Sequence, residues 1–157
     1  MWLFLLLSLP LSFALTQKCH GDSFQSSDGS KCFLIVPGNM TYNGALSESQ
    51  KVASTHCPNG GVSHLTVIKG QTDIDLFKSK TLTGNDRSGV WIGATRDKED
   101  WQEWSWIDGT PVDLEMRKRL VKGDCVYFTG NYHSFYCDYN VLYGYAVEYT
   151  CNPTEEL

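Results

Sequence analysis

The chain has 157 residues, of which 41% are hydrophobic and 20% are charged, a composition typical of a globular protein with one domain. Its 18 acidic and 13 basic residues give a net charge of -5, which argues against a nucleic-acid partner because phosphate contacts require a basic surface. Outside the N-terminus no apolar run approaches the roughly 18 residues of a membrane-spanning helix, so we expect no stable membrane insertion.

Residues 1–14 form an apolar segment without a charged side chain. Ser12 and Ala14 supply the small-x-small pattern of a signal peptide, with cleavage expected after a residue between Ala14 and Thr16. A buried helix or a membrane anchor is the alternative. It is disfavoured because the segment is short for a bilayer and Pro10 would interrupt a helix. We therefore predict a secreted, extracellular protein.

Export places the six cysteines where disulfides persist. They are Cys19, Cys32, Cys57, Cys125, Cys137 and Cys151. An even number indicates three disulfides, although the sequence alone leaves about 15 pairings open. There is no C-x-x-C pair and no H-x-x-x-H arrangement, so zinc ligation has little support and we expect no cofactor.

The first half of the chain contains the predicted helices. Strands are predicted over residues 31–36 and 63–69, and Thr41 caps a helix predicted over residues 41–55. A capping-box-like pair, Thr72 and Asp75, begins a second, shorter helix. The buried stripe of that helix comprises Ile74, Leu76 and Phe77.

From Val90 onward, aromatic and β-branched residues gather in short segments separated by Gly, Asp and Asn, which is typical of strands. The predicted strands span residues 90–95, 103–107, 124–129, 134–139 and 143–151. Helices followed by strands predict an α+β domain. We expect this domain over residues 19–151, followed by a polar tail over residues 152–157.

Two segments carry a resemblance to a known family. They are Trp91-Ile92-Gly93-Ala94 and Trp104-Ser105-Trp106-Ile107-Asp108-Gly109. Both resemble the central landmarks of C-type lectin-like domains. They occur in the family's order together with Cys57, Gly60-Gly61, His64-Leu65 and the last three cysteines. The chain is thereby identified as a C-type lectin-like domain.

The resemblance implies the disulfide pairing. It implies the bridges Cys57–Cys151 and Cys125–Cys137, and Cys19–Cys32 then closes an N-terminal hairpin. The bridge from Cys57 to Cys151 closes the longest loop, for which the chain-entropy model gives roughly 4 to 5 kcal/mol.

Sugar-binding members of the family hold calcium with Glu-Pro-Asn or Gln-Pro-Asp in the long loop and with a Trp-Asn-Asp motif. In this chain His133 and Ser134 occupy the places of the Asn and Asp, and neither supplies a charged oxygen ligand. Between Gly109 and Cys125 the only proline is Pro111, which is flanked by Thr and Val. We therefore expect no metal site and binding that does not depend on calcium.

The aromatic residues give two candidate contacts. Trp91, Trp104 and Trp106 match core positions of the family, whereas Trp101 follows a polar turn and is a candidate for exposed contact or a single exposed apolar residue. The residues Tyr143, Tyr145, Val147 and Tyr149 alternate as in a packed strand. Tyr132 and His133, expected on a loop before Cys137, form the preferred contact pair.

One basic cluster lies where a calcium-binding member would carry its ligands. It comprises Arg117, Lys118, Arg119 and Lys122. It suits a sulfated or sialylated glycan or an acidic protein. Alternatively it is a solvated loop whose charge is offset by Asp113, Glu115 and Asp124, and this is the interpretation we favour. We predict a binding face from residues 114–124 with Trp101, Tyr132 and His133.

Asn39-Met40-Thr41 is the only glycosylation sequon, and it lies between a strand and a helix where Asn39 is expected to be accessible. The alternative is an unmodified surface Asn.

The chain contains no G-x-S-x-G and no H-E-x-x-H, so we predict that it is not an enzyme. We predict a secreted C-type lectin-like module that binds a carbohydrate or an extracellular protein through its loops. The alternative is a structural or assembly protein that pairs with another chain through the same face.

Overall fold

The computed structural model describes residues 17–81 and 88–153. The predicted signal peptide, residues 1–14, and the end of the polar tail lie outside the described residues. No helix in the part of the chain that the structure describes is long and apolar enough to cross a bilayer.

The strands form one eight-stranded sheet with the order β1-β2-β8-β4-β6-β7, to which β3 adds on β8 and β5 adds on β4. Their bounds are β1 Phe24–Gln25, β2 Cys32–Pro37, β3 Gly61–Leu65, β4 Val90–Arg96, β5 Trp104–Trp106, β6 Cys125–Phe128, β7 Tyr132–Phe135 and β8 Gly144–Cys151. The last strand, β8, is central: it pairs antiparallel with β2 and β3 and parallel with β4. The predicted α+β fold is confirmed.

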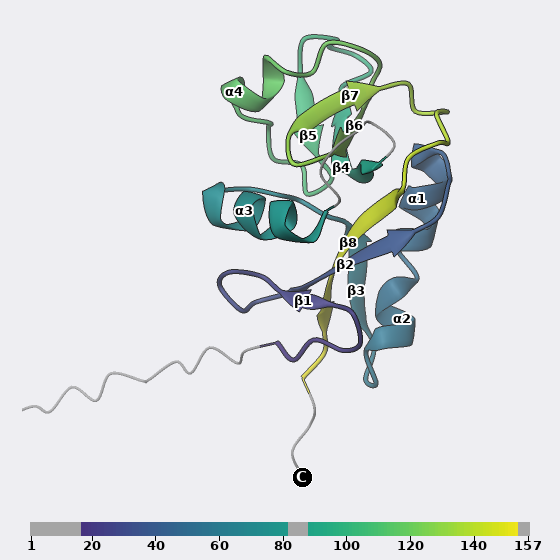
Figure 1. Ribbon diagram of the computed structural model, residues 1–157, viewed down its shortest axis with the longest axis vertical. Coiled ribbons are helices and arrows are strands. Elements are labelled where there is room, and N and C mark those ends of the chain that lie inside the picture. The colour runs from purple at the N-terminus through teal and green to yellow at the C-terminus, as the bar shows by residue number, and fades with distance from the viewer. Residues whose placement is uncertain (1–16, 82–87, 154–157) are drawn as a thin grey trace, which may run out of the picture.

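Four helices accompany the sheet in the described residues. They are α1 Tyr42–Ser49, α2 Val52–His56, α3 Gln71–Lys80 and α4 Leu114–Arg117. Helices α1 and α2 lie on one side of β8 and α3 lies on the other, while α4 belongs to the loop-rich half beside β5 and β7 (Figure 1). We call the part around β8, β2 and β3 the framework half, and the part from β4 to β7 with α4 the loop half.

Strand β8 is buried on both faces, which explains its run of apolar residues. Tyr145, Val147 and Tyr149 face one core cluster, whereas Ala146 belongs to the other. The sequence predicted that Tyr143 packs in this strand together with Tyr145, Val147 and Tyr149. Tyr143 instead precedes β8 and is 41% exposed. Its inclusion was therefore wrong, because the loop before β8 turns its ring outward to solvent.

The family tryptophans lie in the core as predicted. Trp91, Trp104 and Trp106 are each less than 5% exposed. Because a buried indole N–H requires an acceptor, Trp91 donates to the carbonyl oxygen of Met40 at 2.9 Å. This bond ties β4 to the start of α1.

All six cysteines are paired in the order that the resemblance implied: Cys19–Cys32, Cys57–Cys151 and Cys125–Cys137. The first two bridges belong to the framework half, and the third closes β6 and β7 in the loop half.

The predicted helix over residues 41–55 is divided into α1 and α2. The backbone N–H of Lys51 bonds to the carbonyl of Glu48, and the Ser49 hydroxyl bonds to the carbonyl of Leu46. These shorter-range bonds tighten the turn and interrupt the α-helical pattern. The N-cap by Thr41 is confirmed, since its hydroxyl accepts from the N–H of Gly44 at 3.2 Å.

The predicted capping box of the second helix is wrong. Helix α3 begins earlier, after Gly70, which has a positive φ of 81° and provides no side-chain cap. Thr72 lies inside the helix, and Asp75 instead accepts a hydrogen bond from Gln71 at 2.7 Å. Phe77 is fully buried, and Ile74 and Leu76 pack against the same core.

Candidate ligand-binding site

The loop half contains Trp101 and residues 114–124, which are part of the binding face predicted from the sequence. This loop face comprises the turn between β4 and β5, residues 97–103, and the segment over residues 113–124 that contains α4. Both segments lie at the end of the domain furthest from the described termini (Figure 1). The structure brings Trp101 beside the end of the predicted segment, residues 114–124.

Arg96, the last residue of β4, joins the two segments. Its guanidinium donates to the carbonyl of Trp101 at 3.3 Å and to the carbonyl of Gly123 at 3.2 Å. Nε lies 3.2 Å from Oδ1 of Asp124, and the guanidinium covers the Trp104 ring at 4.8 Å. A planar group with several donors can hold two turns together in this way. No pattern in the sequence distinguished Arg96 as a candidate site residue.

The turn that presents Trp101 is ordered by its own hydrogen bonds. The Asp97 carboxylate accepts from the backbone N–H groups of Asp100 and Glu99, and these bonds lower the pKa of Asp97. Trp101 is 68% exposed at the tip of this turn. Its indole is therefore presented to solvent by a fixed backbone, which is the arrangement expected of a contact residue.

Helix α4 was missed by the sequence interpretation, which treated this segment as a loop. Asp113 is its N-cap and accepts from the N–H of Met116 at 2.8 Å, a signal that the sequence contained. Met116 and Leu120 are buried and anchor the segment to the core. The basic residues therefore lie on a short helix and turn whose position is fixed by these two buried side chains.

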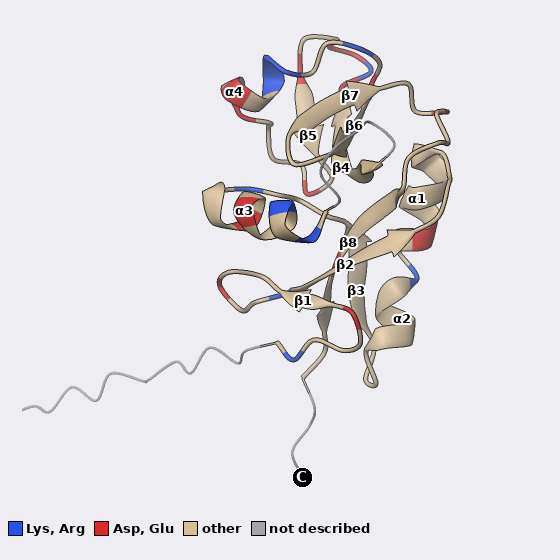
Figure 2. Ribbon diagram, viewed as in Figure 1, with Lys and Arg blue, Asp and Glu red and all other residues tan. Residues whose placement is uncertain are grey.

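The basic cluster is largely paired within the molecule. Arg117 contacts Glu103 at 3.0 Å, Lys118 contacts Glu115 at 2.6 Å, and the Lys122 ammonium lies 4.6 Å from the centre of the Phe135 ring. Arg119 is exposed, and within residues 17–81 and 88–153 no carboxylate lies at ion-pair distance from it. Figure 2 shows acidic and basic segments side by side in this region. The loop face is thus of mixed charge rather than strongly cationic.

The predicted contact pair does not lie on a loop. Tyr132 and His133 belong to β7, where successive side chains point to opposite faces of the sheet. Tyr132 packs edge-on against Trp106 and Phe128, and its hydroxyl donates to the carbonyl of Ile68 at 3.1 Å. Burial raises the pKa of Tyr132. The two residues therefore do not form a common contact surface.

His133 lies on the other face of β7 and is stacked on Tyr127, with ring centroids 5.2 Å apart. Next to it, Ser134 is buried, and its hydroxyl accepts from the N–H of Lys122 at 3.1 Å. Ser134 thus takes part in holding the end of the basic segment. Gly123 completes this contact, because a Cβ there would overlap the backbone of Phe135.

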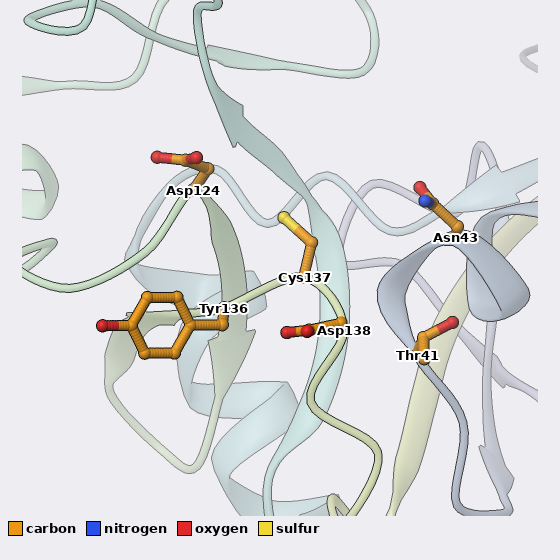
Figure 3. A pocket seen from close by; sticks show the side chains of 6 residues that line it. All are labelled: Thr41, Asn43, Asp124, Tyr136, Cys137 and Asp138. Carbon is orange, nitrogen blue, oxygen red and sulfur yellow. The ribbon is translucent and has the colours of Figure 1, made fainter.

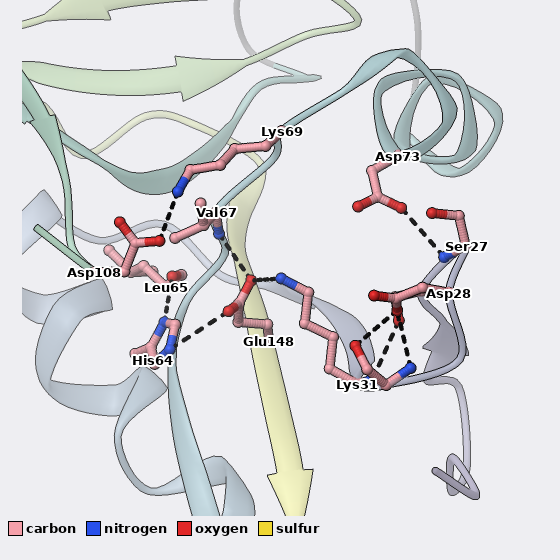
Figure 4. Close-up of polar contacts among 12 residues, drawn as sticks. Ser27, Asp28, Lys31, His64, Leu65, Val67, Lys69, Asp73, Asp108 and Glu148 are labelled. Carbon is pink, nitrogen blue, oxygen red and sulfur yellow. Dashed lines mark hydrogen bonds and ion pairs between the residues drawn. The ribbon is translucent and has the colours of Figure 1, made fainter. Parts of the chain in front are cut away.

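An ion pair connects the turn after β5 to the segment between β3 and α3. Lys69 contacts Asp108 at 2.7 Å (Figure 4). Its ammonium also bonds to the hydroxyl of Thr110. Burial alone would raise the pKa of Asp108, but hydrogen bonds from Lys69 and Thr110 outweigh it and lower the pKa to about 2. Within the described residues, no group of three His, Cys, Asp or Glu side chains could hold a metal ion.

A groove adjoins the loop face on its α1 side, and the sequence did not predict it. Its larger cavity has a volume of 660 Å³, and its lining includes Leu46, Arg96 and Trp101. The smaller cavity of 340 Å³ includes Tyr136 and Asp138, and both cavities share Asn43, Asp124 and Cys137. In Figure 3 Asp124 and Tyr136 lie on one side of Cys137, Thr41 and Asn43 lie on the other, and the Asp138 carboxylate points toward Tyr136.

The chain resembles known proteins both in sequence and in fold. The sequence profile of the family described as Lectin C-type domain matches residues 46–143. The chain belongs to the C-type lectin domain family. This confirms the resemblance seen in the sequence, and domains of this family are in general binding modules without enzymatic activity.

Individual relatives are distant. Killer cell lectin-like receptor 5 of Mus musculus is 23% identical over 104 residues, which are 64% of this chain and 34% of the receptor. The chain thus spans about a third of that curated relative.

Two solved structures share the fold. The mouse scavenger receptor C-type lectin carbohydrate-recognition domain is 24% identical with a TM-score of 0.59, over 84% of this chain and 96% of the other. The cow carbohydrate-recognition domain of CD23, studied with a GlcNAc2Man3 oligosaccharide, is 19% identical with a TM-score of 0.64, over 87% and 99% of the two chains. At these identities the similarity shows the fold alone.

Proposed function

We propose that the chain is a secreted C-type lectin module that binds a carbohydrate or an extracellular protein through its loop face, without calcium-dependent sugar coordination. The observation that carries this proposal is the position of Arg96, which fixes the exposed indole of Trp101 beside Gly123 and Asp124. An exposed aromatic ring on an ordered turn provides contact area at little entropic cost.

Two further observations support binding without calcium. Ser134, which takes the place of a family calcium ligand, is buried and hydrogen-bonded to Lys122. His133, in the neighbouring place, is stacked on Tyr127. Both side chains therefore serve the local packing, and their chemistry does not suit a hard cation.

A glycan and cell-surface protein array, probed with the purified chain in millimolar calcium and in EDTA, tests the proposal. We expect equal binding in both buffers. Trp101→Ala should weaken binding about tenfold, and Arg119→Ala should weaken it less and reduce its salt dependence. Lys18→Ala, an exposed cation away from the loop face, is the matched control. Binding that disappears in EDTA would contradict the calcium-independent mode.

A second candidate function is assembly with another chain through the same face. It is favoured by the exposure of two apolar side chains on the segment over residues 113–124, Leu114 at 63% and Val121 at 82%. Size-exclusion chromatography over a hundredfold range of concentration tests it. Self-association that Leu114→Ser and Val121→Ser abolish would support this candidate, and a concentration-independent monomer would reject pairing between copies of this chain.

Asn39 is exposed in the connection between β2 and α1, and we propose that it carries a glycan in the secreted protein. Mass spectrometry of protein from a eukaryotic secretion host, before and after amidase treatment, tests this modification. An unmodified Asn39 peptide would contradict it.

A further inference from the structure

The groove beside α1 is distinct from the place where the family holds calcium. Neither His133 nor Ser134 contributes to the lining of its two cavities. One wall comes from α1, and the other comes from the β4–β5 turn and from the residues after β7. Its cavity volumes of 660 and 340 Å³ fall in the range of about 300 to 1,000 Å³ that is usual for ligand sites.

The groove offers two kinds of contact. Trp101 and Tyr136 are exposed by 68% and 53%, so each cavity has an aromatic ring that a ligand can reach. The polar lining includes Asn43 and Asp124, which belong to both cavities, and Asp138, which belongs to the smaller one. An aromatic face packs against the C–H groups of a pyranose ring, while amide and carboxylate groups bond to its hydroxyls.

The polar groups of the smaller cavity are available for a ligand. Among the described residues, no hydrogen bond or ion pair occupies the side-chain polar atoms of Asn43, Tyr136 or Asp138. Asp124 lies 3.2 Å from Nε of Arg96, but Nε does not donate a hydrogen bond to it. The carboxylate oxygens of Asp124 can therefore accept hydrogen bonds from hydroxyl groups.

The charges in the groove select against an acidic ligand. The lining of the smaller cavity has two carboxylates, Asp124 and Asp138, and no cationic side chain. Outside the lining, the ammonium of Lys122 lies 5.5 Å from the centre of the Tyr136 ring and covers one part of it. Arg96 and Lys98 occur only in the larger cavity, where Asp97 and Asp124 offset them. Sulfate or carboxylate groups of a glycan would be repelled at the Asp138 end, whereas neutral hydroxyls would not.

We infer that this groove binds a neutral disaccharide unit of a glycan without a metal ion. One pyranose ring lies against Tyr136 and bonds to Asn43, Asp124 and Asp138, and the next ring lies against Trp101. The inference rests on the proposed function and narrows its ligand to a carbohydrate.

The experiment is NMR titration of the isotope-labelled chain in EDTA with the neutral disaccharides lactose, maltose, mannobiose and diacetylchitobiose. At least one should cause saturable shifts at the Trp101 indole N–H and at the amides of Asn43 and Asp138. The indole signals of the buried Trp91 and Trp104 should not move. Asn43→Ala and Asp138→Ala should each weaken that binding about tenfold.

Asn140→Ala and Tyr143→Ala are matched controls, because both residues are exposed and line neither cavity. No response at Asn43 and Asp138 to any of the four sugars overturns the inference. Sugar shifts confined to Arg119 and its neighbours also overturn it, but leave the proposed function standing. Lysine amide serves as a cationic probe. If it shifts the signals of the groove and no sugar does, the groove binds cations and the inference is overturned.

Discussion

In each half of the domain one charged side chain contacts several segments, but the two side chains lie in different surroundings. In the framework half, Glu148 on β8 is 8% exposed. One of its oxygens accepts from Lys31 at 2.8 Å and from the N–H of Val67 at 3.0 Å, and the other lies 3.4 Å from Nε2 of His64 (Figure 4). This carboxylate connects β8 to the residues around β2 and β3.

In the loop half, Arg96 connects two turns rather than strands. Its side chain is 21% exposed, and its partners are backbone carbonyls and the exposed carboxylate of Asp124. A buried group among paired strands contributes mainly to global stability, whereas a partly exposed group between turns contributes mainly to the position of those turns. Residues that stabilise the fold are therefore separate from those that position the proposed loop face, and five measurements test this separation.

The largest effect is expected from the disulfides. Cys57 and Cys151 are 94 residues apart and Cys125 and Cys137 are 12 apart. In the chain-entropy model, replacing the first pair by Ala should lower the free energy of unfolding by about 4 to 5 kcal/mol, and replacing the second by about 3 kcal/mol. Urea denaturation measures both. Equal losses would show that loop length does not govern the difference.

The next effect is expected at Glu148. Glu148→Ala leaves Lys31 and the N–H of Val67 without their acceptor, so the free energy of unfolding should fall by about 3 kcal/mol. Glu48→Ala is the matched control, because Glu48 pairs with Lys51 on the exposed surface of α1 and its loss should cost about 0.5 kcal/mol. Similar costs for the two variants would remove the distinction between a buried and an exposed ion pair.

A smaller loss of stability, about 1 to 2 kcal/mol, is expected for Arg96→Ala. Its main consequence should be faster hydrogen exchange at the amides over residues 97–103 and at Gly123, with the β8 amides unchanged. Arg96→Lys should behave similarly, since an ammonium group cannot reproduce the bonds of a planar guanidinium. If β8 exchanges faster to the same extent, Arg96 also supports the framework half.

The smallest effect is expected from pH. The pKa of Asp108 is lowered to about 2, against an unfolded value of about 4. Its stabilising contribution is therefore present above about pH 4 and is lost as the pH falls toward 2. Asp108→Asn should reduce the pH dependence of the melting temperature between about pH 2 and pH 4. It should also make amide hydrogen exchange near Thr110 faster. An unchanged slope would show that the bonds from Lys69 and Thr110 are weak.

Asp28 provides the corresponding test in the framework half. Hydrogen bonds from the side chain and backbone of Ser30 and from Ser26 lower its pKa to about 2. Asp28→Asn should reduce the pH dependence of the melting temperature over the same pH range. Amide hydrogen exchange in the loop half should stay unchanged. A change at Thr110 in this variant would show that the two halves are coupled.

Much of the framework was predictable because its signals are local or covalent. Trp91 and Trp104 stand in landmarks of the family, and Thr41 supplies a helix cap within its own turn. The division of the first predicted helix into α1 and α2 was not predictable from periodicity. The hydrogen bonds to the carbonyls of Leu46 and Glu48 interrupt the helix, but its buried positions continue at almost the same spacing. Most of the candidate site was missed for a related reason: Asn43, Arg96 and Asp138 belong to no local pattern.

The sequence by itself determined the family and the α+β class, because these depend on residue identity at recognisable positions. Only the tertiary structure decided which residues meet at the binding surface. Arg96 contacts Trp101 and Gly123 in two separate turns, and Asn43 and Asp138 line the same cavity although they are far apart in the sequence. Such contacts arise from chain packing between distant segments, for which a single sequence carries no periodic or spacing signal.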